Sequence, residues 1–141
     1  MVALFGAALL VAGCSTMKDE PPTSMAMGAG ATLSSANEVP VNASKATGSS
    51  TVWVAENRLV TGKVSISGMM PTAAHIHEAP AGANGPVIVT LTKMSDTMFT
   101  VPEGTMLTPA QYANYMAGKL YINVHSAAHP GGEIRVQLSP K

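Results

Sequence analysis

The chain has 141 residues and no formal net charge, because its eight Lys and Arg residues balance eight Asp and Glu residues. It contains no basic run, so a nucleic acid is not expected as a partner. A single cysteine excludes an internal disulfide, and residues 14–141 are long enough to bury one hydrophobic core without such a bridge.

The beginning of the chain has the features of a targeting segment. Residues 2–13 are almost wholly apolar; the run is too short to span a bilayer, which needs roughly 20 residues, but is typical of a signal peptide. It ends in LVAGC at Cys14, which resembles a bacterial lipobox, where a cysteine after a small residue is lipidated. We therefore expect residues 1–13 to be a lipoprotein signal peptide and Cys14 to be the lipidation site. No Lys or Arg precedes the apolar run, so we expect the natural start to lie upstream.

This resemblance to a lipobox predicts that the protein lies in the bacterial cell envelope. Ser15 follows Cys14, whereas Asp at that position would resemble the signal for inner-membrane retention. We therefore expect a lipid anchor in the outer membrane, with the protein facing the periplasm. Residues 14–31 are rich in Pro, Gly and Ala without apolar periodicity, and this composition predicts a flexible tether.

The remainder of the chain is expected to form short strands. Runs rich in β-forming residues, separated by turn residues, occupy 50–54, 59–68, 73–77, 87–91, 99–101, 119–125 and 133–138. One helix is predicted at about 108–117, where Thr108 and Gln111 form a capping box around Pro109, and Gly118 ends it. This pattern predicts an all-β fold, an antiparallel Greek-key-like β-sandwich or barrel with one short helix.

The alternation of apolar residues along these strands predicts the hydrophobic core. Val64 and Ile66 share one face of their strand, as do Ile134, Val136 and Leu138. The core residues expected are Val52, Trp53, Val64, Ile66, Val87, Val89, Ile122, Val124, Ile134 and Val136. In the last strand, Glu133 and Arg135 are two residues apart, and we expect them to form an ion pair that holds the preceding turn.

All four histidines lie in two clusters, His75 with His77 and His125 with His129. Two residues apart on a strand, His75 and His77 point to the same face. Histidine is the commonest metal-ligating side chain, and imidazole suits copper and zinc. The pattern predicts a metal site formed by His75, His77, His125 and His129, with copper as the expected ion and zinc as the second choice.

Two kinds of neighbouring residue are expected to tune this site. A thioether from Met69 or Met70 would favour Cu(I). A carboxylate from Glu78 or Glu133 would accept a hydrogen bond from a ligand ring and orient it.

Four segments resemble the CHRD (chordin-like) domain family. They are residues 33–40 (LSSANEVP), residues 74–87 with AHIH and GANGPV, residues 118–126 (GKLYINVHS) and residues 130–135 (PGGEIR). Their order and spacing agree with the family from about residue 31 to residue 138, and we take residues 32–139 as the domain. The resemblance implies a β-sandwich and a non-enzymatic module, of the kind found in chordin, an extracellular binding protein, and in bacterial secreted proteins. His129 stands where the family often has Asn, so the resemblance implies no role for it.

Three functional hypotheses follow. The first is an envelope-anchored metal-binding module. The second is a metal-free protein-interaction or adhesion module, which the family resemblance favours. The third is an enzyme, either a dismutase-like redox catalyst or a hydrolase. The His-x-His-Glu strand is loosely similar to copper–zinc superoxide dismutase, but the chain lacks that enzyme's cysteine pair and its run of zinc ligands. No Gly-x-Ser-x-Gly nucleophile motif is present, so we expect no enzymatic activity.

Overall fold

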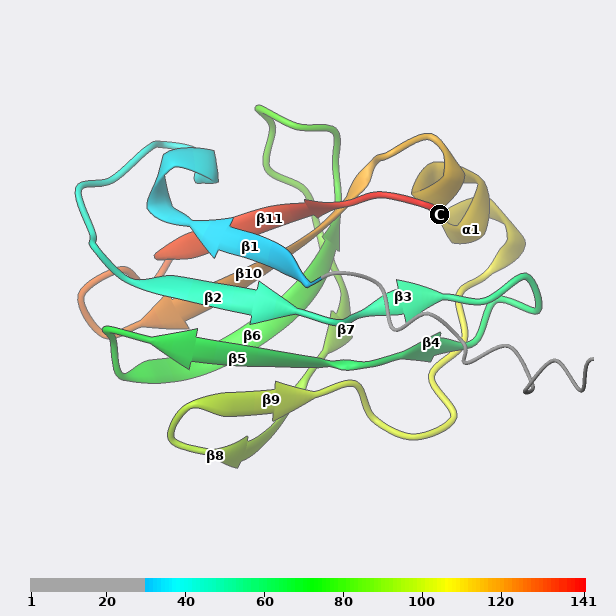
Figure 1. Ribbon diagram of the computed structural model, residues 1–141. Helices are drawn as coiled ribbons and strands as arrows, with labels where there is room; N and C mark the ends of the chain where they lie inside the picture. Colours follow the sequence, from blue (N-terminus) through cyan, green and yellow to red (C-terminus); the bar gives the residue numbers. More distant parts are fainter. Residues whose placement is uncertain (1–29) are drawn as a thin grey trace, which may run out of the picture.

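Every β-pairing in residues 30–141, the part of the chain that the structure describes, is antiparallel. The structure is a computed structural model, shown in Figure 1. Its large sheet has nine strands, in the order β7 (Val87–Thr90), β6 (Pro71–Glu78), β10 (Leu120–Ser126), β11 (Ile134–Leu138), β1 (Ala31–Ser34), β2 (Thr47–Ser50), β5 (Lys63–Ser67), β9 (Met98–Thr100) and β8 (Thr92–Ser95). A small sheet pairs β3 (Trp53–Val54) with β4 (Val60–Thr61).

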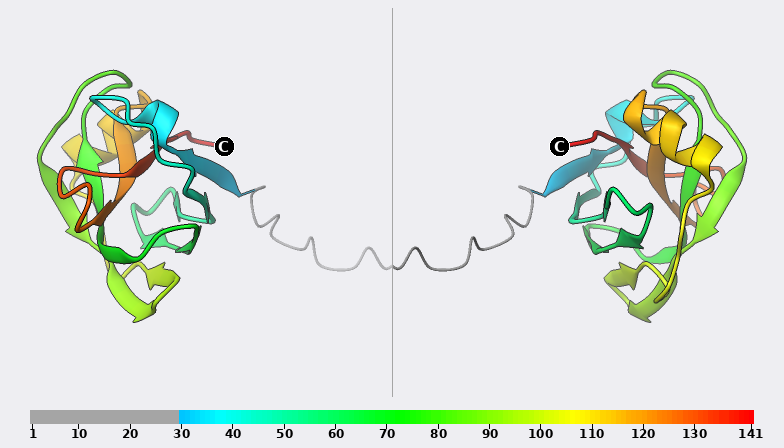
Figure 2. Two further views of the ribbon diagram at one scale, coloured as in Figure 1. Left: turned by 90° about the vertical axis from the view of Figure 1, so that its left-hand side faces the viewer. Right: turned by 90° about the vertical axis from the view of Figure 1, so that its right-hand side faces the viewer.

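The large sheet curls into a nearly closed barrel. Its two edge strands, β7 and β8, follow one another in the chain and are joined at the buried Leu91. The backbone N–H of Leu91 donates to the carbonyl of Ala74 in β6 at 3.0 Å. Figure 2 shows β1, β2 and β5 on one side of the interior and β6, β7 and β10 on the other. The expected all-β antiparallel fold is thus confirmed.

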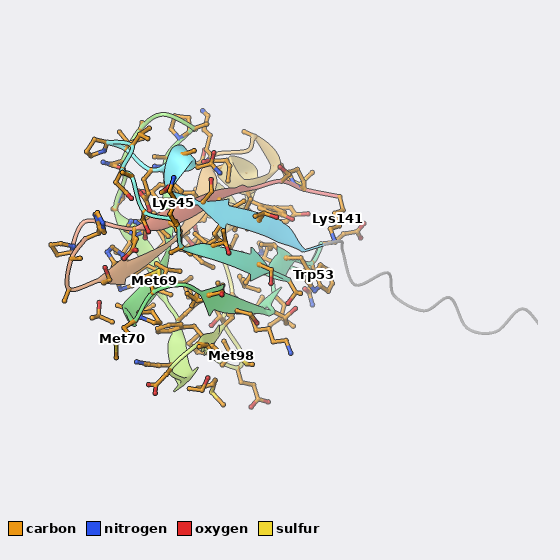
Figure 3. The ribbon with its side chains drawn as sticks, turned by 60° about the vertical axis from the view of Figure 1, so that its left-hand side comes forward. Lys45, Trp53, Met69, Met70, Met98 and Lys141 are labelled. Carbon is orange, nitrogen blue, oxygen red and sulfur yellow. The ribbon has the colours of Figure 1, made fainter. Side chains whose placement is uncertain are left out.

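The hydrophobic core fills the inside of the curled sheet. The predicted faces of β5 and β11 point inward, with Val64 and Ile134 fully buried. Two core predictions are wrong. Val87 is 47% exposed, since it begins the edge strand β7. Trp53 is 42% exposed, because strand alternation turns Val52 and Val54 inward and therefore turns Trp53 outward; it lies at the Lys141 end of the domain (Figure 3).

The predicted helix is confirmed as α1 (Pro109–Met116), the one α-helix of the described chain. The Thr108 hydroxyl accepts from the backbone N–H of Gln111 at 3.1 Å, and the Gln111 side chain accepts from the backbone N–H of Thr108 at 2.8 Å. Gly118 ends the helix with a φ of 70°, in the left-handed region. A 3₁₀ turn, η1 (Ser35–Asn37), follows β1. No helix among residues 30–141 is long and apolar enough to cross a membrane.

Strands β6, β10 and β11 have a second, polar face that is also covered. All seven residues of β10 are buried: Leu120, Ile122 and Val124 belong to the hydrophobic core, and the alternate side chains point the other way. Residues 79–86 and the segment after η1 cover that outer face, and Asn84 joins them by donating to the carbonyl of Val39 at 2.7 Å. This arrangement positions the histidines.

Candidate metal centre

Three of the four predicted ligands meet on the outer face of β6 and β10. His75 and His77 project from β6, and His125 projects from the neighbouring β10. Each ring offers one nitrogen, and the three nitrogens lie within 4.8 Å of one another. Nδ1 of His75 is 2.9 Å from Nε2 of His125.

These distances are close to those of a metal site. Two nitrogens bound to one ion at about 2.0–2.1 Å lie roughly 2.9–3.4 Å apart when the angle at the ion is between 90° and tetrahedral. The 2.9 Å separation between His75 Nδ1 and His125 Nε2 falls within that range, and it is also the length of the hydrogen bond between the two rings. Because His125 Nδ1 donates to Pro130, the donor of this bond is His75 Nδ1–H, and an ion would take the place of that proton. The third nitrogen, at no more than 4.8 Å from the others, needs to approach by up to about 1.4 Å.

Backbone carbonyls fix which ring nitrogens are available. Nδ1 of His77 donates to the carbonyl of Gly85, and Nδ1 of His125 donates to the carbonyl of Pro130, both at 2.9 Å. Because a neutral imidazole carries one N–H, the Nε2 atoms of His77 and His125 retain their lone pairs. Nε2 of His77 is buried and has no hydrogen-bond partner. Both rings are therefore held in the tautomer that can bind an ion.

The charge states of the rings also suit a metal. Burial lowers the pKa of His75, and the neighbouring His125 and His77 lower it further. Burial likewise lowers the pKa of His77, against the opposing effect of its hydrogen bond to Gly85. Near neutral pH both rings are uncharged, which is the form that coordinates a metal.

A stack of three side chains supports His77. Its ring lies on the ring of Tyr121, with centroids 4.8 Å apart and planes inclined by 5°. The guanidinium carbon of Arg135 lies 3.4 Å from the centroid of the same tyrosine. The Tyr121 hydroxyl also accepts from the backbone N–H of Gly85 at 3.2 Å, so it holds the residue whose carbonyl fixes the His77 tautomer.

His129, the fourth predicted ligand, lies outside this group of three. Its backbone closes the turn after β10: the carbonyl accepts from Gly132 N at 3.1 Å, and the N–H donates to the Ser126 hydroxyl at 3.1 Å. Its side chain influences Glu133 instead of the three clustered rings. Burial raises the pKa of Glu133, but hydrogen bonds from Ser126 and Ser44, with the contribution of His129, lower it overall.

Two other expectations for carboxylates are wrong. The acceptors that orient the ligand rings are the carbonyls of Gly85 and Pro130, and neither Glu78 nor Glu133 takes this role. Glu133 accepts from the hydroxyls of Ser44 and Ser126 rather than pairing with Arg135. The guanidinium donates to neutral acceptors, namely the carbonyl of Pro80, Oδ1 of Asn84 and Oε1 of Gln137.

Met69 and Met70 lie within the described residues, and Cys14 does not. Met69 packs against the hydrophobic core, and Met70 is 85% exposed (Figure 3), so a thioether contact to the ion stays a prediction.

Four residues around the triad of His75, His77 and His125 were missed as site residues, namely Tyr121, Asn123, Arg135 and Glu38. The one signal in the sequence was that Tyr121 and Asn123 alternate with His125.

Comparison with known proteins gives one family. Residues 29–138 match the model of the CHRD domain. The match begins two residues before β1 and ends with β11, so it covers the whole of the curled sheet. No curated protein and no solved structure matches the chain.

Proposed function

This chain belongs to the CHRD domain family, and we propose that it binds a metal ion, copper in preference to zinc, through His75, His77 and His125. One observation carries the proposal: three imidazole nitrogens lie within 4.8 Å, and two of the rings are held by backbone carbonyls with Nε2 unprotonated. Copper is favoured because imidazole sites of this kind bind Cu²⁺ more tightly than Zn²⁺.

The function proposed is binding and not catalysis. A copper ion on three imidazoles is able to cycle between oxidation states, so a redox assay is the relevant comparison. We expect the copper-loaded chain to dismutate superoxide no faster than the same concentration of free copper. A substantially faster rate would favour the dismutase-like hypothesis.

We also propose that the domain is held at the bacterial envelope by a lipid on Cys14, in the outer membrane and facing the periplasm. The support comes from the sequence alone, namely the apolar run of residues 2–13 and the lipobox-like LVAGC. In this setting the domain would meet ions that enter the periplasm. The sequence does not identify a protein partner.

Metal titration of the whole chain tests the proposal. After chelation, the protein is titrated with Cu(II) and separately with Zn(II), and its melting temperature is measured. We expect one ion per chain and a melting temperature that rises with metal concentration, because an ion that binds only the folded state stabilises it by mass action. Protein isolated from its native envelope should contain copper at near one ion per chain.

The matched variants are a triple change, His75→Gln with His77→Gln and His125→Gln, and the single change His129→Gln. The triple variant should fold and bind no copper, since the hydrophobic core lies on the other side of β6 and β10. The His129 variant should bind as the unaltered chain does. Stoichiometric copper on the folded triple variant would place the ligands elsewhere, and no binding by the unaltered chain would favour the metal-free interaction module.

A further inference from the structure

Three buried side-chain atoms in residues 30–141 have no hydrogen-bond partner: His77 Nε2, Asn123 Oδ1 and Glu38 Oε1. Buried polar atoms are ordinarily paired, so each of these needs an explanation. All three belong to side chains on or over the polar face of β6, β10 and β11. They therefore point to one site that extends from the triad to Glu38.

Asn123 lies at the centre of this face. It is directly opposite His75 in the pairing of β6 with β10, it is two residues from His125, and it is 2% exposed. Its side chain is also close enough to His77 to raise the pKa of that ring. The amide is therefore beside all three candidate ligands.

While the His77 ring is neutral, Asn123 Oδ1 and His77 Nε2 do not bond to each other, and the reason is chemical. Nδ1 of His77 carries the ring proton and donates a hydrogen bond to the carbonyl of Gly85, so Nε2 is an acceptor. An amide oxygen is also an acceptor. A protonated Nε2 would donate to this oxygen, which is how Asn123 acts to raise the pKa of His77. Two buried acceptors that lie close together are satisfied at once by a positive charge placed between them. A metal ion on the triad is such a charge.

Glu38 approaches the same amide from the other side. A Cβ built on Gly132 would lie 2.6 Å from Asn123 Nδ2 and 2.7 Å from Glu38 Oε1, so both atoms border one small space. Nδ2 makes only a long contact with the carbonyl of Gly131, at 3.4 Å. A small tilt of the amide would turn Oδ1 onto the ion and Nδ2 onto the carboxyl group of Glu38, which is 3% exposed.

We propose, on the basis of the metal-binding function above, that Asn123 Oδ1 is a further ligand of the ion and that Glu38 is the positioning residue that holds the amide and balances the ion's charge. An oxygen ligand backed by a carboxylate suits a divalent ion, whereas Cu(I) prefers soft sulfur ligands. The site therefore takes Cu(II) and Zn(II) in preference to Cu(I).

Substitutions at position 123 separate ligation from packing. Asn123→Leu keeps the branched shape of the side chain and removes the oxygen, and Asn123→Asp keeps an oxygen. Asn42→Ala is the control, because this amide is bonded at both ends, to Glu133 O and Ser44 N, and lies outside the triad. Affinities for Cu(II), Zn(II) and Cu(I) are measured by competition, and the Cu(II) electron paramagnetic resonance (EPR) spectrum is recorded for each whole chain.

We expect Asn123→Leu to lower the affinities for Cu(II) and Zn(II) about tenfold or more and to change the Cu(II) hyperfine splitting. Its affinity for Cu(I) should stay within about threefold of that of the unaltered chain. Asn123→Asp should retain divalent binding. Glu38→Gln should lower the affinities for Cu(II) and Zn(II) and leave the affinity for Cu(I) unchanged. Asn42→Ala should leave both the affinities and the spectrum unchanged.

The outcomes separate this inference from the proposed function. The inference is overturned if Asn123→Leu binds Cu(II) with unaltered affinity and spectrum, or if Asn42→Ala lowers the Cu(II) affinity as much as Asn123→Leu does. In either case the proposed binding of metal by the three histidines is unaffected. If the unaltered chain binds no metal, both fall. Should Asn123→Leu fail to fold, the structure of the unaltered chain with zinc decides: an Oδ1–zinc distance near 2.0–2.2 Å supports the inference, and an amide turned away from the ion overturns it.

Discussion

The imidazole of His77 lies flat on the ring of Tyr121, with 4.8 Å between centroids and 5° between planes. Arg135 covers the tyrosine from the opposite side, because β10 lies between β6 and β11. The same guanidinium donates to Pro80 O and Asn84 Oδ1, which belong to the loop that carries Gly85. The orientation of a candidate ligand therefore depends on a stack and a loop that contribute no ligand themselves.

Tyr121→Phe tests this dependence. The substitution keeps the stacked ring and removes the hydroxyl that accepts from Gly85 N at 3.2 Å. We expect copper affinity to fall about three- to tenfold and stability to fall by about 1 kcal/mol, because the loop loses one hydrogen bond. Nitrogen NMR shifts of the His77 ring should show a mixture of tautomers where the unaltered chain shows only Nδ1–H.

The matched control for this substitution is Tyr115→Phe, which removes a buried hydroxyl bonded to Ser139 O at 3.4 Å, outside the triad. It should change neither the affinity nor the tautomer. Equal effects of the two substitutions on the His77 shifts would mean that the stack does not position the ring.

Glu38 should make the stability of the domain fall as the pH rises. Burial raises its pKa to about 7 from 4.5, against the lowering effect of Arg135. Between these two values the folded state holds the proton and the unfolded state has released it, so the free energy of unfolding falls with increasing pH, by up to about 3 kcal/mol. Glu38→Gln carries no ionisable group, so it should remove this fall and be the more stable protein at pH 8.

Chemical denaturation at pH 5 and at pH 8 measures this effect. The Glu133→Gln variant is the comparison, because the pKa of Glu133 is lowered and its contribution to stability is lost in the opposite direction, as the pH decreases. A Glu38→Gln protein whose stability falls with pH as steeply as that of the unaltered chain would show that another group is responsible.

Gly132 should be intolerant of a side chain, whereas the adjacent Gly131 should tolerate one. A Cβ at position 132 would meet both Asn123 and Glu38, and its φ of 127° is one that other residues rarely adopt; a Cβ at position 131 would have no atom within 4 Å. We expect Gly132→Ala to lower stability by roughly 1–3 kcal/mol and to weaken copper binding, with Gly131→Ala near neutral. Thermal melts and copper titrations of the pair check this, and equal melting temperatures would contradict it.

The pairing of His75 with His77 could be predicted from the sequence, because strand alternation alone places both on one face. Which strand lies beside them could not be derived from alternation, since the pairing of β6 with β10 joins residues about 50 positions apart. The same rule, applied strictly, excludes Trp53 from the core once Val52 and Val54 point inward. Long-range pairing is decided by the whole sheet and leaves little local signal.

The surroundings of the triad were harder to predict, because they come from loops. The tautomers of His77 and His125 are fixed by carbonyls of Gly85 and Pro130, and any residue type supplies a carbonyl. Glu38 reaches the site from a segment that precedes β6 by some 30 residues. His129 had the right residue type and spacing, but its backbone is used to close a turn.

Cys14→Ala should release the protein from the membrane fraction. The apolar run of residues 2–13 and the lipobox-like LVAGC are the basis for proposing a lipid on Cys14 as the anchor. One acyl chain binds a membrane only marginally, so stable retention requires the several chains of a processed lipoprotein cysteine. Fractionation of cells that express the unaltered chain, Cys14→Ala and the triple histidine variant measures this: the histidine variant should stay with the membrane, and only the cysteine variant should become free. Retention of Cys14→Ala in the membrane fraction would rule out the lipid on this residue as the anchor.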